Sequence, residues 1–410
     1  MEVIHRRCAG GDVDGMRVVV CIRIARGRRV ERETRTFETT TKGLLALADW
    51  LEENRCTHIL LESTGVYWRP VYHILSERMT VVLANAAEVK NVPGRKSDVS
   101  DAAWLADLIA HGLVRASFVP PPPIQELRDL TRTRKQLIRE VARHKQRLQK
   151  ILEDANVKIA HVLSDLLGES GRRMLEALIA GETDPSRLAD LGDVRLKSAR
   201  EDRIEALRGR VTEHHRFMLK LHLGQIRSVE ATIDDLDQRI EKAVTPFRAV
   251  LERILKIPGI SKVNAPAVLA EIGADMSTLP AAPHLVSWAG ICPQLNASGG
   301  KRLSTKARRG NVWLKTLIIQ AAWAASRTKG TYFEAKYRRL RARRGPQKAL
   351  VALAASLLTA IYHVIRDNAE YRDLGPDHFD RLANKDRIAK RYLRRLEKLG
   401  YRVTVQPNAA

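Results

Sequence analysis

Four acidic residues stand out in a chain that is otherwise strongly basic. They are Asp12, Glu62, Asp98 and Asp101, and the formal net charge of the whole chain is +24. Carboxylates that converge on one point repel each other strongly where water is excluded. A divalent cation with oxygen ligands is the usual reason for such a cluster, and in a basic protein it suggests chemistry on nucleic-acid phosphates. Whether these acids form a site depends on the elements that carry them.

The N-terminal region alternates patterns that are typical of strands and helices. Three consecutive strand patterns, rich in β-branched residues, precede an alternation of helix and strand. This order predicts a mixed sheet with helices on its faces. The candidate strands cover 8–13, 16–24, 30–37, 57–61 and 80–83, and the candidate helices cover 41–53 (with Thr40 or Thr41 as the N-cap), 67–78 and 98–111.

Each acid lies at the end or the start of one of these elements. Asp12 ends the first strand, and Glu62 directly follows the apolar strand THILL. Asp98 and Asp101 are three residues apart, so they share one face at the start of a helix. If the first and fourth strands are neighbours, Asp12 and Glu62 lie side by side and the helix crosses that edge. The arrangement predicts a Mg²⁺ site, with room for the two ions of phosphoryl-transfer chemistry.

The same acids have ordinary explanations when they are taken one at a time. Asp12 suits a turn, Asp98 suits a helix N-cap, and Asp101 suits the first turn of a helix. Glu62 is harder to explain in this way, because an acid at the end of an all-apolar strand needs a partner. Taken together, the four residues favour the metal site.

Composition indicates a multidomain protein that binds a polyanion. The chain has 410 residues, 44% of them hydrophobic, and 71 Lys and Arg against 47 Asp and Glu. That length suggests two or three domains. The positive excess favours nucleic acid or an anionic membrane surface as partner.

A membrane location is the weaker alternative. The most apolar run, 349–362, is interrupted by Ser356 and Thr359 and is shorter than the roughly 20 residues that span a bilayer. No apolar signal core follows the N-terminus. We therefore expect a cytoplasmic protein that makes no membrane contact. The four cysteines, Cys8, Cys21, Cys56 and Cys292, have no metal-binding spacing and are expected to be reduced and mostly buried.

The middle of the chain is predicted to be helical. Four prolines at 120–123 indicate a stiff spacer and a domain boundary. Two heptad seams follow, with Arg134, His144 and His222 as their polar members. They predict either an antiparallel pair of long helices or an oligomerisation arm, with a smaller helical insert at 160–200. On this basis we expect a dimer, and a tetramer on DNA.

A glycine-flanked serine lies in the C-terminal region. Ser298 stands in the sequence NASGGK, and its hydroxyl could approach a phosphate closely. Taken alone, this pattern is more typical of a polar loop with basic residues that aid solubility. Ser304 is the competing nucleophile, and Ser261 is a more distant one. The cations that could neutralise phosphate oxygens beside Ser298 are Lys301, Arg302, Lys306, Arg308 and Arg309.

Two further segments could contact phosphates. Residues 257–273 resemble a helix-hairpin-helix, with the turn at 258–260 and a second helix at 263–272, although an ordinary helical hairpin explains them equally well. The stretch 336–348 is densely basic and favours RNA or DNA phosphate contacts. Nearby Tyr332, Phe333 and Tyr337 could stack on bases or lie in the core. The basic residues of that stretch are Lys336, Arg338, Arg339, Arg341, Arg343, Arg344 and Lys348.

Three N-terminal motifs resemble a known family. GGDVDGMRVVVCI, LLESTGVYWRPVYHIL and VPGRKSDVSDAAWLADLIAHGLV are similar to the first domain of the DEDD transposases of the insertion sequence 110 family, which includes Piv-like DNA invertases. The segments IPGISKVNAPAVLAEIG and WAGICPQLNASGGKRLSTKARRGN resemble the family's second domain. Gly11 departs from the pattern, since an apolar residue usually precedes the first Asp.

The resemblance implies a specific chemistry. The N-terminal domain would have an RNase H fold of the RuvC type, with Asp12, Glu62, Asp98 and Asp101 as the acids that hold metal and Lys96 among the nucleic-acid contacts. The protein would be a recombinase guided by a structured noncoding bridge RNA, acting on donor and target DNA. Ser298 would be the nucleophile, which reverses the assessment from the loop alone.

The expected organisation has four parts. They are an α/β catalytic domain over 1–120, a helical coiled-coil region over 121–248, a mostly helical transposase domain over 249–345, and a basic helical tail over 346–410. An RNA-guided recombinase with a serine-linked intermediate is the leading hypothesis, and no nucleotide-binding loop is present to supply energy. A metal-dependent junction nuclease and a non-catalytic nucleic-acid-binding scaffold are the alternatives.

Overall fold

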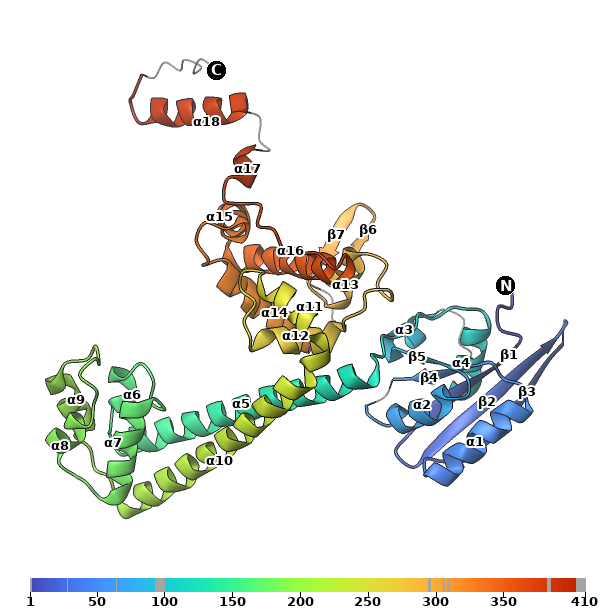
Figure 1. The fold of residues 1–410 in the computed structure, drawn as a ribbon, viewed down its shortest axis with the longest axis horizontal. Coiled ribbons are helices and arrows are strands. Elements are labelled where there is room, and N and C mark those ends of the chain that lie inside the picture. Colours follow the sequence, from blue (N-terminus) through green and yellow to red (C-terminus); the bar gives the residue numbers. More distant parts are fainter. Residues whose placement is uncertain are drawn as a thin grey trace. The chain divides into compact units, whose positions relative to one another are not determined.

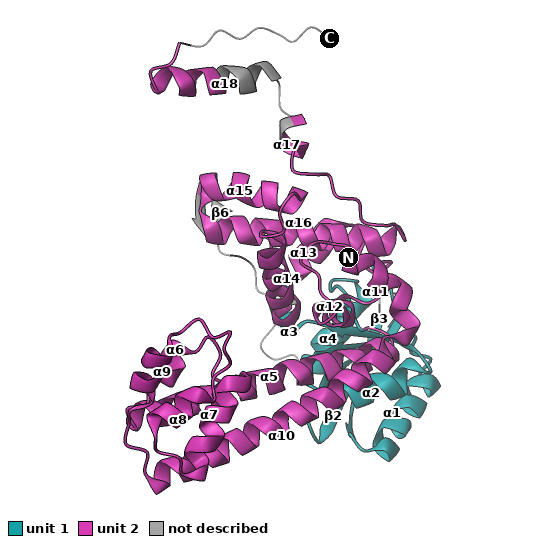
Figure 2. Cartoon of the chain, turned by 60° about the vertical axis from the view of Figure 1, so that its left-hand side comes forward, with its two compact units in different colours: residues 1–119 teal, residues 120–410 magenta. Residues whose placement is uncertain are grey.

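The structure is a computed structural model of the whole chain. It describes residues 2–27, 29–63, 65–92, 100–293, 296–304, 307, 310–381 and 385–402. The chain divides into two compact units, Met1–Val119 and Pro120–Ala410, coloured separately in Figure 2. The break falls directly before the run of four prolines.

A mixed five-stranded sheet forms the centre of unit 1, as the sequence predicts. The strand order is β3-β2-β1-β4-β5, so the first and fourth strands are neighbours. β1 pairs with β2 and β2 with β3 in antiparallel fashion, whereas β1 pairs with β4 and β4 with β5 in parallel. The strands are β1 (Arg7–Val13), β2 (Arg17–Arg26), β3 (Arg29–Glu38), β4 (His58–Glu62) and β5 (Thr80–Ala84).

Helices cover both faces of this sheet (Figure 1). One apolar core joins the sheet to α1 (Thr41–Glu53) and α2 (Trp68–Ser76), and a second joins it to α3 (Ala86–Asn91) and α4 (Asp101–Ala110). The Thr40 hydroxyl caps α1 by accepting from the N–H of Gly43, which satisfies one of the unpaired first-turn amides. The helix expected from residue 98 begins at Asp101 instead, with Ser100 as its N-cap.

Unit 2 begins with two long helices that form an antiparallel arm. In α5 (Pro122–Asp154) and α10 (Glu213–Ala243), Arg134 pairs with Asp237 and His144 with His222, so the two helices run in opposite directions. The heptad seams are thus filled within one chain, which is the first of the two arrangements that the sequence left open. A small insert with its own apolar core closes the far end of the arm; it contains α6 (Ile159–Val162), α7 (Glu169–Ala180), α8 (Pro185–Asp190) and α9 (Arg200–Leu207).

The prediction that 120–123 form a spacer outside any helix is wrong for its second half. Pro121 is the N-cap of α5, and Pro122 and Pro123 occupy its first turn. Proline is tolerated there because the first-turn N–H groups have no intrahelical acceptor in any case.

The C-terminal part of unit 2 is a helical core with one small hairpin. One apolar cluster joins the base of the arm to the helices that follow, including α14 and α16. The elements are η1 (Thr245–Phe247), α11 (Arg248–Leu255), α12 (Asn264–Ile272), α13 (Ala282–Trp288), β6 (Asn296–Ser298), β7 (Lys301–Ser304), α14 (Val312–Ala325), α15 (Tyr332–Arg344), α16 (Pro346–Arg366), α17 (His378–Arg381) and α18 (Lys385–Lys398).

The basic tail predicted over 346–410 needs correction for its first part. α16 is the central helix of the core, with Leu353, Leu357, Ile361 and Tyr362 fully buried. In the described part of the chain it is the one helix long and apolar enough to cross a membrane, but half of its most apolar window is buried inside the protein. The pattern of a core helix therefore explains its composition.

Candidate functional site

The strand register brings Asp12 and Glu62 to neighbouring positions. Gly10 pairs with Leu60 and Gly11 with Leu61 in the parallel ladder of β1 and β4. The next residue of each strand is the acid, so both carboxylates leave the sheet at the same level of the same edge. The condition set by the sequence, that the first and fourth strands be neighbours, is met.

Gly10 brings α4 against this edge. A Cβ at Gly10 would lie 2.3 Å from the carbonyl oxygen of Ala102 and 2.3 Å from the amide nitrogen of Ala106, so only glycine lets the helix approach this closely. Because side chains alternate along a strand, Asp12 emerges on the same face as Gly10. Asp101 precedes Ala102 and is thereby placed near Asp12.

The electrostatics of Asp12 agree with this placement. Burial raises the pKa of the Asp12 carboxyl, and the negative charges of Asp101 and Asp14 raise it further, against a lowering by the N–H of Val13. A buried carboxylate whose pKa is raised by neighbouring negative charges favours a bound cation.

Asp14 takes the turn role that could have explained Asp12. Its Oδ1 accepts from the N–H of Met16 at 2.7 Å and of Arg17 at 2.8 Å, which closes the turn between β1 and β2. Asp12 lies within β1, opposite Val19, and is not a turn residue. Likewise, Ser100 takes the N-cap role that could have explained Asp98, by accepting from the N–H of Ala103 at 3.3 Å.

A buried ion pair that the sequence analysis missed fixes α4 on the sheet. Arg23 in β2 is 4% exposed, and its Nε donates to Asp107 of α4 at 2.9 Å. Arg32 in β3 donates to both oxygens of the same carboxylate, at 2.8 and 3.0 Å. The available signal was an arginine inside an apolar strand, since such a charge needs a partner.

The donor set suits a hard divalent cation, which prefers carboxylate oxygens. Within the described residues, no three His, Cys, Asp or Glu side chains lie close enough together to hold a metal ion. Asp98, the fourth acid, and Lys96 lie outside the described residues. The fit therefore rests on the type of donor, on the neighbouring strand ends that carry Asp12 and Glu62, and on the nearness of Asp101 to Asp12, although these three side chains do not form a metal-holding group as they stand.

Ser298 ends the first strand of a hairpin in unit 2. It pairs with Lys301 across a two-residue turn, and Gly299 and Gly300 have φ of +57° and +76°. Two left-handed residues are typical of the tight turns that join antiparallel strands. No heavy atom lies within 4 Å of a Cβ built at either glycine, so the tip is open. The polar loop expected from the sequence is thus the turn of a short antiparallel hairpin.

The structure describes some of the other candidate residues of this region and not others. Lys301 is exposed, and Ser304 lies opposite Asn296 in the hairpin. Ser261 has a structural role, because its hydroxyl accepts from the N–H of Asn264 at the start of α12. Lys306, Arg308 and Arg309 lie outside the described residues, as do the side chains of Ser298 and Arg302.

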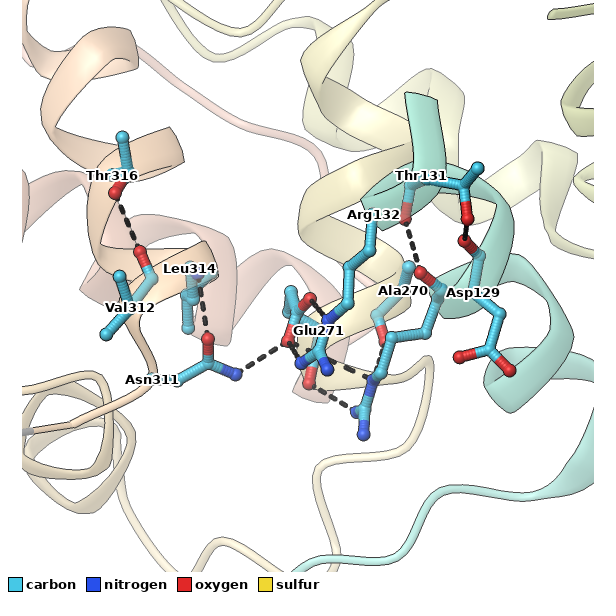
Figure 3. A network of polar contacts seen from close by, with 11 residues as sticks. Asp129, Thr131, Arg132, Ala270, Glu271, Asn311, Val312, Leu314 and Thr316 are labelled. Carbon is cyan, nitrogen blue, oxygen red and sulfur yellow. Dashed lines mark hydrogen bonds and ion pairs between the residues drawn. The ribbon is translucent and has the colours of Figure 1, made fainter. Parts of the chain in front are cut away.

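A buried carboxylate organises the chain just after this hairpin (Figure 3). Glu271 of α12 is 1% exposed and accepts from Arg132 of α5 through two hydrogen bonds of 2.8 Å. It also accepts from Nδ2 of Asn311 at 2.6 Å, and Asn311 caps α14 through the N–H of Leu314. Arg128 donates to the carbonyl oxygens of Ala270 and Glu271, both at 2.9 Å. Side chains from three distant segments thus hold the end of the hairpin region, which sequence reasoning missed.

The two further segments have clear structural roles. α11 and α12 form the predicted helical hairpin, but a Cβ at Gly259 would lie 2.2 Å from the carbonyl oxygen of Ala321, so this glycine serves packing against α14. In α15, Phe333 and Tyr337 are core residues. Arg338 pairs with Glu334 at 2.7 Å, and Arg339 lies over the ring of Phe379 at 4.9 Å. Arg338, Arg339, Arg341, Arg343 and Arg344 are all exposed, and their contact with nucleic acid remains a prediction.

Comparison with known proteins gives matches to both ends of the chain. Residues 9–157 match a family model for the DEDD domain of IS110 elements, described as "Transposase", and residues 251–338 match the model of the "Transposase IS116/IS110/IS902 family". The first match contains Asp12, Glu62, Asp98 and Asp101, and the second contains Ser298.

Two of the relatives described here span most of the chain, and a third spans just over a third of it. A "Probable family 20 transposase" of Pseudomonas aeruginosa is 26% identical over 68% of this chain and 75% of its own length. A "Pilin gene-inverting protein" of Moraxella lacunata is 25% identical over 82% of this chain and 89% of its own. An "Insertion element IS110 uncharacterized 43.6 kDa protein" of Streptomyces coelicolor is 31% identical over 37% of this chain and 36% of its own.

Proposed function

We propose that this chain, which belongs to the IS110 family of transposases, cuts and rejoins the DNA of an insertion element through a serine-linked intermediate. Membership of the family makes it a transposase, an enzyme that acts on DNA, with an RNase H-like N-terminal domain. The residues that act, the cofactor and the guide are the proposed part.

The observation that carries the proposal is the placement of two acids at neighbouring strand ends, with a third acid near one of them. Asp12 and Glu62 follow paired residues of two parallel strands, and Gly10 lets α4 bring Asp101 near Asp12. Asp12, Glu62, Asp101 and, from the sequence, Asp98 would hold one or two Mg²⁺ ions. Bound Mg²⁺ would supply charge neutralisation at the reacting phosphate.

Ser298 would be the nucleophile. Its Oγ would bond to the phosphorus, the bond from phosphorus to one deoxyribose oxygen would break, and the seryl proton would end on that leaving oxygen. One phosphodiester replaces another, so rejoining needs no external energy. The open Gly299-Gly300 turn and the exposed Lys301 support this role, since they leave room for a phosphate and a cation to meet it.

Three partners complete the proposal. A structured noncoding RNA would guide the protein to donor and target DNA, in the prokaryotic cytoplasm. The protein would act as a dimer that forms a tetramer on DNA, because four strands are cut. Since α5 and α10 pair with each other within the chain, self-association would use other surfaces than the heptad seams.

A covalent adduct would test the proposal directly. Protein, the RNA transcribed from the flanks of the element, and DNA carrying the joined element ends are incubated with Mg²⁺ and resolved on a denaturing gel. We expect a protein–DNA adduct in the wild type and none in Ser298→Ala. Ser304→Ala is the matched control in the same hairpin and should keep the adduct.

The two alternative functions, a junction nuclease and a non-catalytic scaffold, predict different products on the same gel. Cleavage without an adduct that survives Ser298→Ala would overturn the serine mechanism in favour of a hydrolytic junction nuclease. Binding of nucleic acid without cleavage, by the wild type and the variants alike, would indicate a non-catalytic nucleic-acid-binding scaffold. Asp12→Asn should abolish cleavage under the first two mechanisms, and retained cleavage in this variant would overturn the acidic site.

A further inference from the structure

One face of α5 carries a row of cations that the proposed function does not use. Spacings of three, four and seven residues place them within about 40° of a single line on an α-helix. The row covers residues 128–150, so on an α-helix it would extend about 33 Å. Its members are Arg128, Arg132, Lys135, Arg139, Arg143 and Lys150.

No acid interrupts this face. The two acids within the same stretch, Asp129 and Glu140, are rotated about 80–100° away from the line. The face also lies opposite the seam with α10, whose contacts include Arg134 and His144. The row is therefore directed away from the partner helix of the arm.

The two ends of the row differ in their contacts. Arg128 and Arg132 are tied to α12 by the Glu271 network of Figure 3 and anchor the helix. The other four cations, Lys135, Arg139, Arg143 and Lys150, form no ion pair within the described residues, and the carboxylate of Glu271 acts on Lys135 only at longer range. By contrast, Arg134 and Lys145, two of the three α5 cations off this face, do pair with carboxylates: Arg134 pairs with Asp237, and Lys145 pairs with Asp165 at 2.5 Å. Only Arg147 is off the face without a described carboxylate partner, so most of the unpaired charge of α5 lies on one face.

Three side chains concentrate charge at the inner end of the row. The guanidinium groups of Arg132 and Arg139 lie over the ring of Trp313, at 5.3 and 5.4 Å from its centroid. The Nζ of Lys135 is shielded from solvent, without a hydrogen-bond acceptor among the described residues. A shielded ammonium group without an acceptor costs free energy, which a bound anion would return. Trp313 is the second residue of α14, so the positive end of that helix dipole adds to the field.

We infer that this face of α5 is a binding track for a phosphodiester backbone, with Lys135, Arg139 and Trp313 at its inner end. A row of fixed positive charges fits a polymer whose negative charge repeats regularly. DNA and the guide RNA share that chemistry, and the experiment below separates them. The inference rests on the proposed function only in taking nucleic acid as the partner, and it requires no serine intermediate.

Salt-dependent binding tests the track. The double variant Arg139→Gln/Arg143→Gln is compared with Lys220→Gln/Arg239→Gln, which removes two exposed cations without a carboxylate partner in the described structure from α10. Both variants have the same net charge, so a difference between them is local. Binding of a labelled DNA duplex and of an RNA hairpin, each of about 30 base pairs, is measured by fluorescence anisotropy over a salt series.

The expected result is a loss of phosphate contacts in the α5 variant alone. Its slope of log K against log salt should fall by about 2, because each lost contact removes about 0.9, and its affinity at low salt should fall at least about tenfold. A change with the duplex alone assigns the track to DNA, and a change with the hairpin alone assigns it to RNA. Equal slopes for the two variants with both probes would overturn the inference.

Two controls keep this result separate from others. Thermal melting of both variants checks that the exposed substitutions leave the fold intact. Ser298→Ala should bind with the wild-type slope. Suppose that neither the wild type nor any variant forms the covalent protein–DNA adduct, but that the α5 variant still has a smaller slope of log K against log salt. The proposed serine-linked strand transfer would then be wrong, and the binding track on α5 would be supported.

Discussion

The acidic edge of unit 1 and the serine hairpin of unit 2 are held in different ways. Asp12, Glu62 and Asp101 take their positions from backbone geometry, since they stand at the ends of paired strands and at the start of a helix that touches the sheet at Gly10. The hairpin region ends at α14, whose N-cap Asn311 is held by Glu271 and, through it, by Arg132. Strand pairing and helix packing therefore position the acidic edge, whereas hydrogen bonds between side chains fix the end of the serine hairpin region.

The two regions also differ in how far their acidic charges are compensated by other side chains. Burial and the charge of Asp101 raise the pKa of Asp12, which favours a bound cation at the acidic edge. Glu271 is matched by Arg132 at 2.8 Å and by Arg128 at 3.9 Å, so its charge is compensated within the fold. We expect unit 1 to respond to metal and pH, and unit 2 to respond to the loss of single side chains.

Glu271→Gln should have the largest effect on stability. The amide preserves the shape but leaves Arg128 and Arg132 beside a neutral group, and breaking a buried ion pair in this way costs about 3–5 kcal/mol. The free energy of unfolding is measured by denaturant titration. Hydrogen exchange of α12 and α14 peptides should accelerate, while peptides of unit 1 should not change.

Asp237→Asn is the matched control. It removes a carboxylate that also binds an α5 arginine through two contacts, but this carboxylate is 45% exposed. A solvent-exposed pair contributes about 0.2–1 kcal/mol. Equal losses in the two variants would mean that the Glu271 network is no more than another surface ion pair.

Gly10→Ala should have the next largest effect, and it should act on unit 1. The added Cβ would meet backbone atoms of α4 at 2.3 Å, so the helix must shift, at about 1–3 kcal/mol. Cleavage should be lost because Asp101 moves with the helix. In Gly11→Ala the Cβ would meet the flexible Cδ2 of Leu61 at 2.7 Å, so both stability and cleavage should be largely kept. Similar activity in the two variants would contradict the role given to Gly10.

The same contrast explains what the sequence could predict. Alternating patterns located the five strands and the helix that starts at Asp101, because hydrophobic period and β-branched residues report directly on local structure. Strand ends then brought the acids to one edge. The Glu271 network joins residues 132, 271 and 311, whose relation depends on how helices cross, and no local pattern encodes it. The prediction that all four prolines at 120–123 lie outside a helix was wrong for a related reason. The first turn of a helix tolerates proline, whereas the helix interior does not.

Mg²⁺ should stabilise unit 1 and leave unit 2 unchanged. A ligand at ten times its dissociation constant contributes about 1.4 kcal/mol to a folded state that binds it alone. Hydrogen exchange of β1, β4 and α4 peptides should slow on addition of Mg²⁺, and EDTA should reverse this. Asp12→Asn should abolish the response. Slowing of the same size in that variant would mean that the ion binds elsewhere.

The pH dependence of Asp12 is the smallest expected effect and the most direct test of repulsion at the acidic edge. Burial and the charge of Asp101 raise the pKa of this carboxyl in the folded state above the unfolded value of about 3.9. Well below that value both states are protonated and the group costs nothing. As pH rises through it, the unfolded state releases its proton first, so stability falls until the pH passes the folded pKa. Without metal, Asp12→Asn should therefore melt like the wild type at about pH 3 and about 1–2 °C above it at pH 7, a small gain because the carboxyl is only half-buried. A variant that melts below the wild type at pH 7 would show that the carboxylate is compensated within unit 1, and the contrast with Glu271 would fail.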